Sequence, residues 1–393
     1  MYPTPAQRAA LLQQCRHARY VWNLALEQWS MWTRDKGATP GYVEQARQLT
    51  EARAEFDWLR AGSQTVQQQA LRDFDQAVKK FYVGTHRRPT WRNAGKHEGF
   101  RIVGPQAGRV EQVSRRWARM LVPKVGWVRF RLSRALPAAK SYRVTLDRVG
   151  RWHIAFAAIP PPIPAPGTGE VVGVDRGVTA SAALSTGELL TCPELSETEQ
   201  AQLKHLQRRL ARCRPGSNRQ GRVKVAIAKL LARSRDRRKD WVEKTSTDLA
   251  GRFDVIRVED LRVAPMTRRP KPKPDPERPG RFLPNRRRAK AGLNRGILAN
   301  GWRLLVRRLE HKAAGRVEKV NPAYTSQTSS VCGHCAPDNR ESQAVFRCVA
   351  CGHRANADVN AAINIAAGRA VSARRETPPR VSPKREPQLA TFP

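Results

Sequence analysis

Two cysteine pairs near the C-terminus constrain the fold of this chain more than any other feature. They are Cys332-Gly-His-Cys335 and Cys348-Val-Ala-Cys351, with twelve residues between the pairs. Tetrahedral Zn²⁺ takes four soft ligands, and each short turn aims two thiolates at one point. The spacing therefore predicts a Cys₄ zinc ribbon over residues 328–353. A closed site of this kind leaves no position for a substrate, so we expect its one Zn²⁺ to be structural.

The other sulfur and imidazole groups change this prediction little. Only seven cysteines occur in the chain, and their concentration in one segment favours metal binding in a reducing compartment over disulfides. His334 and His353 lie in or beside the two turns. Either imidazole could replace a thiolate, but the four cysteines already complete the site.

A large excess of basic residues indicates the kind of partner. The 393 residues include 73 Lys and Arg against 33 Asp and Glu, a formal charge of +40. The basic residues occur in every segment, which favours nucleic acid over a membrane surface. No run reaches the roughly 18 apolar residues needed to span a bilayer, and no secretory signal pattern opens the chain. We therefore expect a soluble, cytoplasmic, nucleoid-associated protein with no membrane partner.

The N-terminal part shows two different periodicities. Apolar residues at steps of three and four predict long helices in which they form the core, within a helical region over 1–116 that also holds the start of the barrel. Short β-rich runs separated by turns then predict a small antiparallel barrel or sheet over 117–160. The helical stripes are Leu11, Cys15, Ala18, Trp22, Ala25, Trp29 and Trp32, followed by Leu71, Phe74, Val78 and Phe81.

A proline-rich linker at 161–170 marks the clearest domain boundary. The segment 171–371 beyond it reads as one α/β domain in which 253–261, a continuous apolar run, is a central parallel strand. Further expected elements of this domain are a helical insert at 195–250, a basic proline-rich insert at 264–292, a helix near 296–314, a strand at 316–320 and a last helix at 357–371. Residues 372–393 are predicted to be a disordered tail.

Three carboxylates occupy ends of these predicted elements in an otherwise basic chain. Asp175 follows an apolar strand, Glu259 ends the central strand, and Asp358 lies in the first turn of the last helix. Each has a simpler interpretation as a turn residue, a solvated strand end or an acid favoured by the helix dipole. Gathered at one sheet edge, however, the three would repel unless divalent metal neutralised them. Spacing alone does not choose between Glu259 and Asp260.

Several segments resemble the TnpB proteins of bacterial and archaeal insertion sequences, a family of RNA-guided DNA endonucleases related to type V CRISPR effectors. The similarity covers about residues 2–370. Its motifs are YPTPAQRAALLQQCRHARYVWNLALEQ, QQQALRDFDQAVKKFY, LVPKVGWVRFRLSR, GVDRG, RRKDWVEKTSTDLAGRFDVIRVEDL, PAYTSQTSSVCGHC and CGHRANADVNAAINI.

The resemblance implies a mixed α/β multidomain fold. An N-terminal β-barrel (wedge) with a helical insertion precedes a ribonuclease H-like RuvC nuclease domain with an inserted Cys₄ zinc ribbon. It implies that Asp175, Glu259 and Asp358 bind two catalytic Mg²⁺ ions, and it favours Glu259 over Asp260. Implied partners are a transposon-derived guide RNA and target double-stranded DNA, and the implied activity is metal-dependent phosphodiester hydrolysis.

Two other functions remain open at this point. One is an RNA-guided DNA-binding regulator that no longer cleaves, against which the intact acids argue. The other is a transposase or recombinase acting on element ends. The chain lacks the His and Tyr nucleophile arrangement of a tyrosine recombinase, although its three acids could serve strand transfer.

Overall fold

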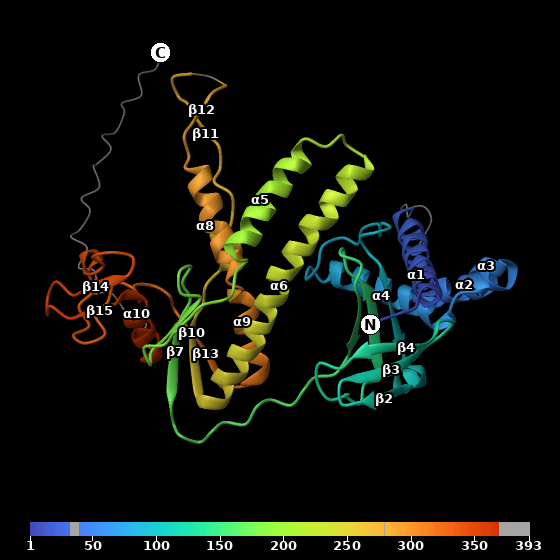
Figure 1. Ribbon diagram of the computed structural model, residues 1–393, viewed down its shortest axis with the longest axis horizontal. Helices are drawn as coiled ribbons and strands as arrows, with labels where there is room; N and C mark the ends of the chain where they lie inside the picture. Colours follow the sequence, from blue (N-terminus) through green and yellow to red (C-terminus); the bar gives the residue numbers. More distant parts are fainter. Residues whose placement is uncertain (32–38, 279, 369–393) are drawn as a thin grey trace, which may run out of the picture. The chain divides into compact units, whose positions relative to one another are not determined.

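The computed structural model describes residues 1–31, 39–278 and 280–368. They form two compact units, one of Met1–Pro160 with Leu203–Leu230 and one of Pro161–Gln202 with Leu231 onward (Figure 1). Trp32 and the predicted disordered tail at 372–393 lie outside the described residues. No helix among the described residues is long and apolar enough to cross a membrane.

Four helices open the first unit. The longest, α1, begins at a capping box. The Thr4 side chain accepts a hydrogen bond from the Gln7 backbone N–H, and the Gln7 side chain accepts one from the Thr4 backbone N–H. The predicted stripe is confirmed, because Leu11, Cys15, Ala18, Trp22 and Ala25 are all buried. The helices are α1 (Pro5–Ser30), α2 (Tyr42–Glu55), α3 (Asp57–Arg60) and α4 (Gln64–Tyr82).

The expected barrel is not closed. The described strands form two separate antiparallel sheets, in the orders β1-β5-β6 and β2-β3-β4, which share one apolar core with α1 and α4. A 3₁₀ turn, η2 (Gly104–Gly108), separates β1 from β2, so the chain leaves one sheet and starts the other. The strands are β1 (Gly99–Val103), β2 (Val110–Ser114), β3 (Trp117–Val122), β4 (Gly126–Arg131), β5 (Ser141–Leu146) and β6 (Trp152–Phe156).

A five-stranded mixed sheet forms the centre of the second unit. Its order is β13-β10-β7-β8-β9, with β10 parallel to both neighbours and β8 antiparallel to β7. The prediction of a central parallel strand at 253–261 is therefore confirmed by β10. The strands are β7 (Val171–Asp175), β8 (Ala182–Leu184), β9 (Leu189–Leu190), β10 (Val255–Glu259) and β13 (Val317–Val320).

Helices cover both faces of this sheet (Figure 1). Val172, Val174, Ile256 and Val258 pack with buried side chains of α6 (Asn218–Arg252) and α9 (Trp302–Lys312) on one face. The alternate residues of β7 and β10 point to the other face, where α10 (Ala357–Ala366) lies. The helix α5 (Glu197–Ala211) precedes α6 and packs on its first half through a small leucine-rich cluster.

The segment expected to be one helix near 296–314 is two helices. The helix α8 (Arg287–Ala299) ends before Gly301, and α9 begins after it. Gly301 has φ +68°, a left-handed conformation that a helix interior does not contain. The insert before α8 holds a single turn, α7 (Val263–Met266), and two short paired strands, β11 (Lys273–Pro274) and β12 (Phe282–Leu283).

The cysteine segment is mostly loop. It contains a 3₁₀ turn, η3 (Pro337–Asn339), and an antiparallel hairpin of β14 (Val345–Arg347) and β15 (Arg354–Asn356). Strand β15 runs directly into α10, so the hairpin fixes where the last helix begins.

Candidate functional site

Two of the predicted acids end neighbouring parallel strands on the same face. Val174 pairs with Val258, which places Asp175 and Glu259 at equivalent ends of β7 and β10. Val174 and Val258, the residues just before these acids, pack on α6 and α9. Because side chains alternate along a strand, Asp175 and Glu259 point to the opposite face, where α10 lies. Glu259 is buried, whereas Asp260 is exposed and comes one position later. The alternation of side chains along β10 therefore shows which of Glu259 and Asp260 faces α10, a choice that their spacing in the sequence could not make.

The third acid reaches this face from α10. Asn356 caps the helix, since its Oδ1 accepts hydrogen bonds from the backbone N–H groups of Asp358 (3.0 Å) and Val359 (3.1 Å). A Cβ placed on Gly177, just after β7, would lie 3.5 Å from Asp358 Oδ2. The Asp358 carboxyl therefore lies beside the turn that follows Asp175.

Gly173 lets α10 come this close. A Cβ at this position would lie 2.0 Å from the Ala362 carbonyl oxygen and 2.4 Å from the Ala366 backbone nitrogen. Only glycine allows the helix backbone to rest directly on β7. The close approach sets the depth at which Asp358 enters the site.

All three carboxyls have raised pKa values. Burial, then the charges of Glu259 and Asp358, raise the pKa of Asp175 to about 8. Burial also raises the pKa of Glu259 and of Asp358. Carboxylate oxygens are the donor set that Mg²⁺ prefers, and a bound cation would offset both the mutual repulsion and the desolvation that raise these pKa values. The residues present therefore fit divalent metal.

Three further side chains orient or balance the acids. Thr325 Oγ1 donates to Glu259 Oε1 at 2.9 Å, and the Arg176 guanidinium donates to the Glu259 carbonyl oxygen. Arg340 Nη2 lies 3.6 Å from Asp358 Oδ1. Sequence reasoning missed all three as site residues. Thr325 lies within the PAYTSQTSS motif, which signals the segment, whereas nothing in the sequence marks Arg340.

A basic cavity adjoins Glu259. Its volume is about 640 Å³, within the range of about 300–1,000 Å³ found for ligand pockets. Arg176 is almost fully buried in its wall, and its Nε has no hydrogen-bond partner among the described residues. The wall also contains Asp260 and Glu310 beside Glu259, but its five cationic side chains outnumber these three acids, and the excess of positive charge suits phosphate oxygens. The cationic residues of the wall are Arg176, Arg262, Arg303, Arg307 and Lys319.

The structure brings together three of the four predicted zinc ligands. The sulfurs of Cys332, Cys348 and Cys351 all lie within 4.8 Å of one another, and the first two are 3.5 Å apart. Thiolates about 2.3 Å from a tetrahedral Zn²⁺ lie about 3.8 Å apart, so these three fit the ion. Cys335 is not in the group and forms a β-bridge with Thr328 instead. The pKa of the Cys332 thiol is lowered, chiefly by a hydrogen bond with the Ser329 side chain. A lower pKa favours the thiolate, the form that zinc binds.

Buried amides connect the cysteine segment to the acids. Asn364 Nδ2 donates to the carbonyl oxygens of Thr325 and Thr328, at 3.0 and 2.7 Å. Asn360 Nδ2 also donates to Thr328, and the Ser330 backbone donates back to Asn360 Oδ1. The loop that carries the Glu259 partner is thus held by α10, the helix that carries Asp358.

Three family models match the chain. A model described as "Probable transposase" matches residues 131–269, one described as "Cas12f1-like, TNB domain" matches 302–365, and one described as "Helix-turn-helix domain" matches 1–37. In the part of 1–37 that the structure describes, the chain forms a single helix of 26 residues, so the helix-turn-helix description does not apply there.

Two relatives and one solved structure extend the similarity over most of the chain. "Putative RNA-guided DNA endonuclease InsQ" of Escherichia coli (strain K12) is 35% identical, over 81% of this chain and 78% of its own. A "Putative RNA-guided DNA endonuclease" of Streptomyces pristinaespiralis is 31% identical, over 99% and 95%. The fold resembles the protein in a cryo-EM structure of a Cas12f1-sgRNA-target DNA complex, with TM-score 0.54 and 14% identity over 92% of this chain and 83% of that one.

Proposed function

The chain belongs to the TnpB family, related to the type V effectors, and from this premise we propose that it is a transposon-associated RNA-guided DNA endonuclease. Convergence of Asp175, Glu259 and Asp358 on one face of the sheet carries the proposal. Residues 171–371 then form a ribonuclease H-like RuvC domain. Acids at the ends of the two central parallel strands of a mixed sheet support this assignment.

The three acids would hold two Mg²⁺ ions. When bound, such a pair activates a water and stabilises the leaving oxygen of a phosphodiester. Asp175 and Glu259 bind from the strand ends and Asp358 from the helix start, while Thr325 keeps the Glu259 carboxylate in one orientation. Arg176 and the cationic wall of the adjoining cavity position the phosphate backbone beside the acids.

Zinc would act structurally in the ribbon at 328–353. Cys332, Cys348 and Cys351 would supply three thiolates, and the spacing of the two pairs makes Cys335 the proposed fourth ligand, for which its sulfur must move to join the group. Zinc would then hold the hairpin of β14 and β15 in place, and with it the cap of α10.

Guide RNA and target double-stranded DNA are the proposed partners. The charge of +40 suits two polyanions, and base pairing between guide and target would carry the sequence information while the protein reads duplex shape. The domains proposed for this task are a recognition region over 1–116, wedge strands over 117–160 and the linker 161–170.

A matched pair of variants tests the assignment. In a DNA-cutting assay with guide RNA and Mg²⁺, Glu259→Gln should slow cutting about a thousandfold or more, because several kcal/mol of metal-based stabilisation disappears. The control Asp260→Asn removes the same charge one residue later, from an exposed side chain that lines the cavity, and should slow cutting far less than Glu259→Gln does. DNA binding should survive in both variants, since other residues contact phosphate.

The same assay separates the alternatives. A regulator that binds without cleaving predicts no cutting by the parent protein. A transposase or recombinase predicts joined element ends among the products. Equal cutting by Glu259→Gln and Asp260→Asn would contradict the proposed site itself.

A further inference from the structure

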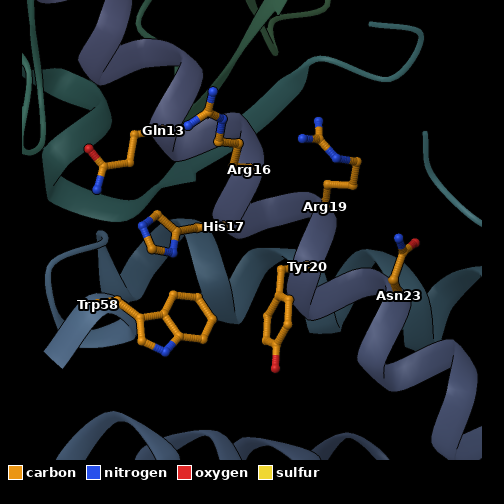
Figure 2. A pocket seen from close by; sticks show the side chains of 7 residues that line it. All are labelled: Gln13, Arg16, His17, Arg19, Tyr20, Asn23 and Trp58. Atoms are coloured by element: carbon orange, nitrogen blue, oxygen red, sulfur yellow. The ribbon is translucent and has the colours of Figure 1, made fainter. Parts of the chain in front are cut away.

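A second pocket lies in the first unit, between one face of α1 and Trp58 of α3. Figure 2 shows the side chains of α1 along one side and the Trp58 ring facing them. The volume is about 590 Å³, enough for a small ligand or a single nucleotide. None of these residues belongs to the acidic site or to the cysteine segment.

Two aromatic rings in this pocket remain accessible. Trp58 is 49% exposed and Tyr20 is 45% exposed. The two rings meet edge to face, with centroids 4.9 Å apart and planes at 88°. Their mutual contact fixes both rings while leaving apolar ring surface open to solvent. Fixed aromatic surfaces of this kind are the ones on which unpaired bases stack.

A buried imidazole adds an unused hydrogen-bond donor. His17 is 4% exposed, and its ring stacks parallel to Trp58 at 5.9 Å. Its Nδ1 lies 3.4 Å from Gln67 Nε2, an amide nitrogen that can only donate, so Nδ1 accepts and Nε2 carries the proton. Burial, with the nearby Arg53, lowers the pKa of His17 and keeps the ring neutral. Nε2 has no partner among the described residues.

One cation at the pocket is also uncommitted. Arg19 is held by Glu98 at 2.8 Å, and Asn23 exchanges two hydrogen bonds with the backbone of Arg92. Arg16 is exposed, and within the described ranges it forms no ion pair or hydrogen bond. The pocket thus presents stacking surface, one neutral donor and one free positive charge, which match the base, the base edge and the phosphate of a nucleotide.

We propose that this pocket binds one unpaired nucleotide of RNA, with its base stacked on the Trp58 ring and its edge against Tyr20. His17 Nε2–H donates to an acceptor atom on the base edge, and Arg16 contacts the phosphate. A paired base cannot enter, because its faces and edge are already occupied, whereas the unpaired bases of RNA loops and ends are splayed out for such contacts. The choice of RNA rests on the proposed function, in which the chain carries a guide RNA.

Photochemical crosslinking tests the contact directly. The probe is the RNA that co-purifies with the full-length chain, transcribed again with 5-iodouridine in place of uridine. Ultraviolet light should join it to peptides that contain Tyr20 or Trp58. Trp58→Leu should remove that crosslink and weaken RNA binding about 5- to 100-fold, the range found when one stacking contact is lost. Trp58→Phe, which retains a ring, should restore most of the affinity.

Matched controls separate the pocket from the rest of the surface. Trp91 is 50% exposed and lies outside the pocket, so Trp91→Leu should bind RNA within about twofold of the parent. Arg16→Gln should reduce the slope of log affinity against log salt concentration by about 1, the loss of one phosphate contact. Arg8→Gln removes an equal charge elsewhere on α1 and should leave that slope unchanged. Circular dichroism melting of each variant checks that the unit stays folded.

The outcomes are distinguishable from failure of the proposed function. RNA that crosslinks only elsewhere, or Trp58→Leu and Trp91→Leu with equal affinities, would overturn the pocket while leaving the endonuclease assignment intact. Equal weakening of binding to single-stranded DNA of the same sequence would overturn the choice of RNA. A chain that binds no RNA at all would contradict both proposals.

Discussion

Three backbone features together bring the carboxyls of Asp175, Glu259 and Asp358 to the same region of the fold. The parallel register of β7 and β10 aligns two strand ends, the alternation of β10 turns Glu259 and not Asp260 toward α10, and the Asn356 cap fixes the first turn of that helix. Each acid has an ordinary interpretation when taken alone. Their partial desolvation and mutual repulsion are costs that a folded chain tolerates when a bound cation offsets them.

The acids also predict how stability depends on pH. Asp175 titrates near pH 8 in the folded protein and near 4 when unfolded, so between these values the folded state holds the extra proton. Stability from this group is therefore present at low pH and lost as the pH rises from about 4 to 8. In zinc-loaded, Mg²⁺-free protein, the parent should lose about 1 kcal/mol or more relative to Asp175→Asn between pH 5 and 8.

Urea unfolding at the two pH values measures this difference, and Asp175→Asn, which cannot titrate, is the reference. Addition of Mg²⁺ should stabilise the parent more at pH 8 than at pH 5. A gap between the two proteins that stays constant with pH would show that Asp175 does not titrate in this range.

The sequence marked the three acids as candidates but did not indicate their surroundings. Polar residues at the ends of apolar runs are visible in a linear pattern, whereas Arg340 and Thr325 reach the acids through the path of a loop. The same limit applies to His17, which lies outside the apolar stripe predicted for α1 and which no sequence pattern marks as buried. Its contacts with Gln67 and Trp58 depend on how α3 and α4 fold back. Cys335 shows the converse, since spacing marks it as a ligand and the structure leaves it outside the sulfur group.

At the scale of elements, α10 joins every part of the site. Its backbone rests on β7 at Gly173, its first turn carries Asp358, and its buried Asn360 and Asn364 hold the loop from Thr325 to Ser330. A shift of this one helix would move the third acid away from the other two.

Gly173→Ala should produce that shift. The added Cβ would lie 2.0 Å from a helix carbonyl, so α10 must move, and we expect a loss of about 1–3 kcal/mol in unfolding free energy. DNA cutting should fall at least tenfold even at a temperature where the variant is folded. The control Gly221→Ala adds the same atom to open space on α6 and should be neutral or slightly stabilising. Normal cutting by a folded Gly173→Ala protein would mean that α10 does not set the position of Asp358.

Zinc removal tests whether the cysteine segment also controls the position of Asp358. Only six residues separate Cys351 from Asp358, and they include β15 and the Asn356 cap. Chelator-treated protein that is resupplied with Mg²⁺ should therefore cut poorly, and Zn²⁺ should restore the rate. Full activity of zinc-free protein with Mg²⁺ would separate the ribbon from the site.

Element prediction succeeded where a pattern was local. The stripe of α1 and the apolar run of β10 each specify their own burial, and both are confirmed. The barrel that the resemblance implies is not closed in the described residues, where the strands form two antiparallel sheets, because strand pairing between distant segments cannot be read from either segment alone. The break at Gly301 was missed because the residues on either side remain helical in pattern.

For the molecule as a whole, composition carried most of the information. A charge of +40 on 393 residues points to polyanionic partners before any motif is considered. The two compact units divide the proposed work, with the nucleotide pocket in the first and the acids, the basic cavity and the cysteines in the second.

Crystallography with Mn²⁺ in place of Mg²⁺ tests the central claim most directly, since Mn²⁺ prefers the same oxygen ligands and scatters anomalously. We predict two anomalous peaks about 4 Å apart, contacted by the carboxylates of Asp175, Glu259 and Asp358. Peaks bound by Asp260 instead, or no peak among the three acids at millimolar Mn²⁺, would contradict the account.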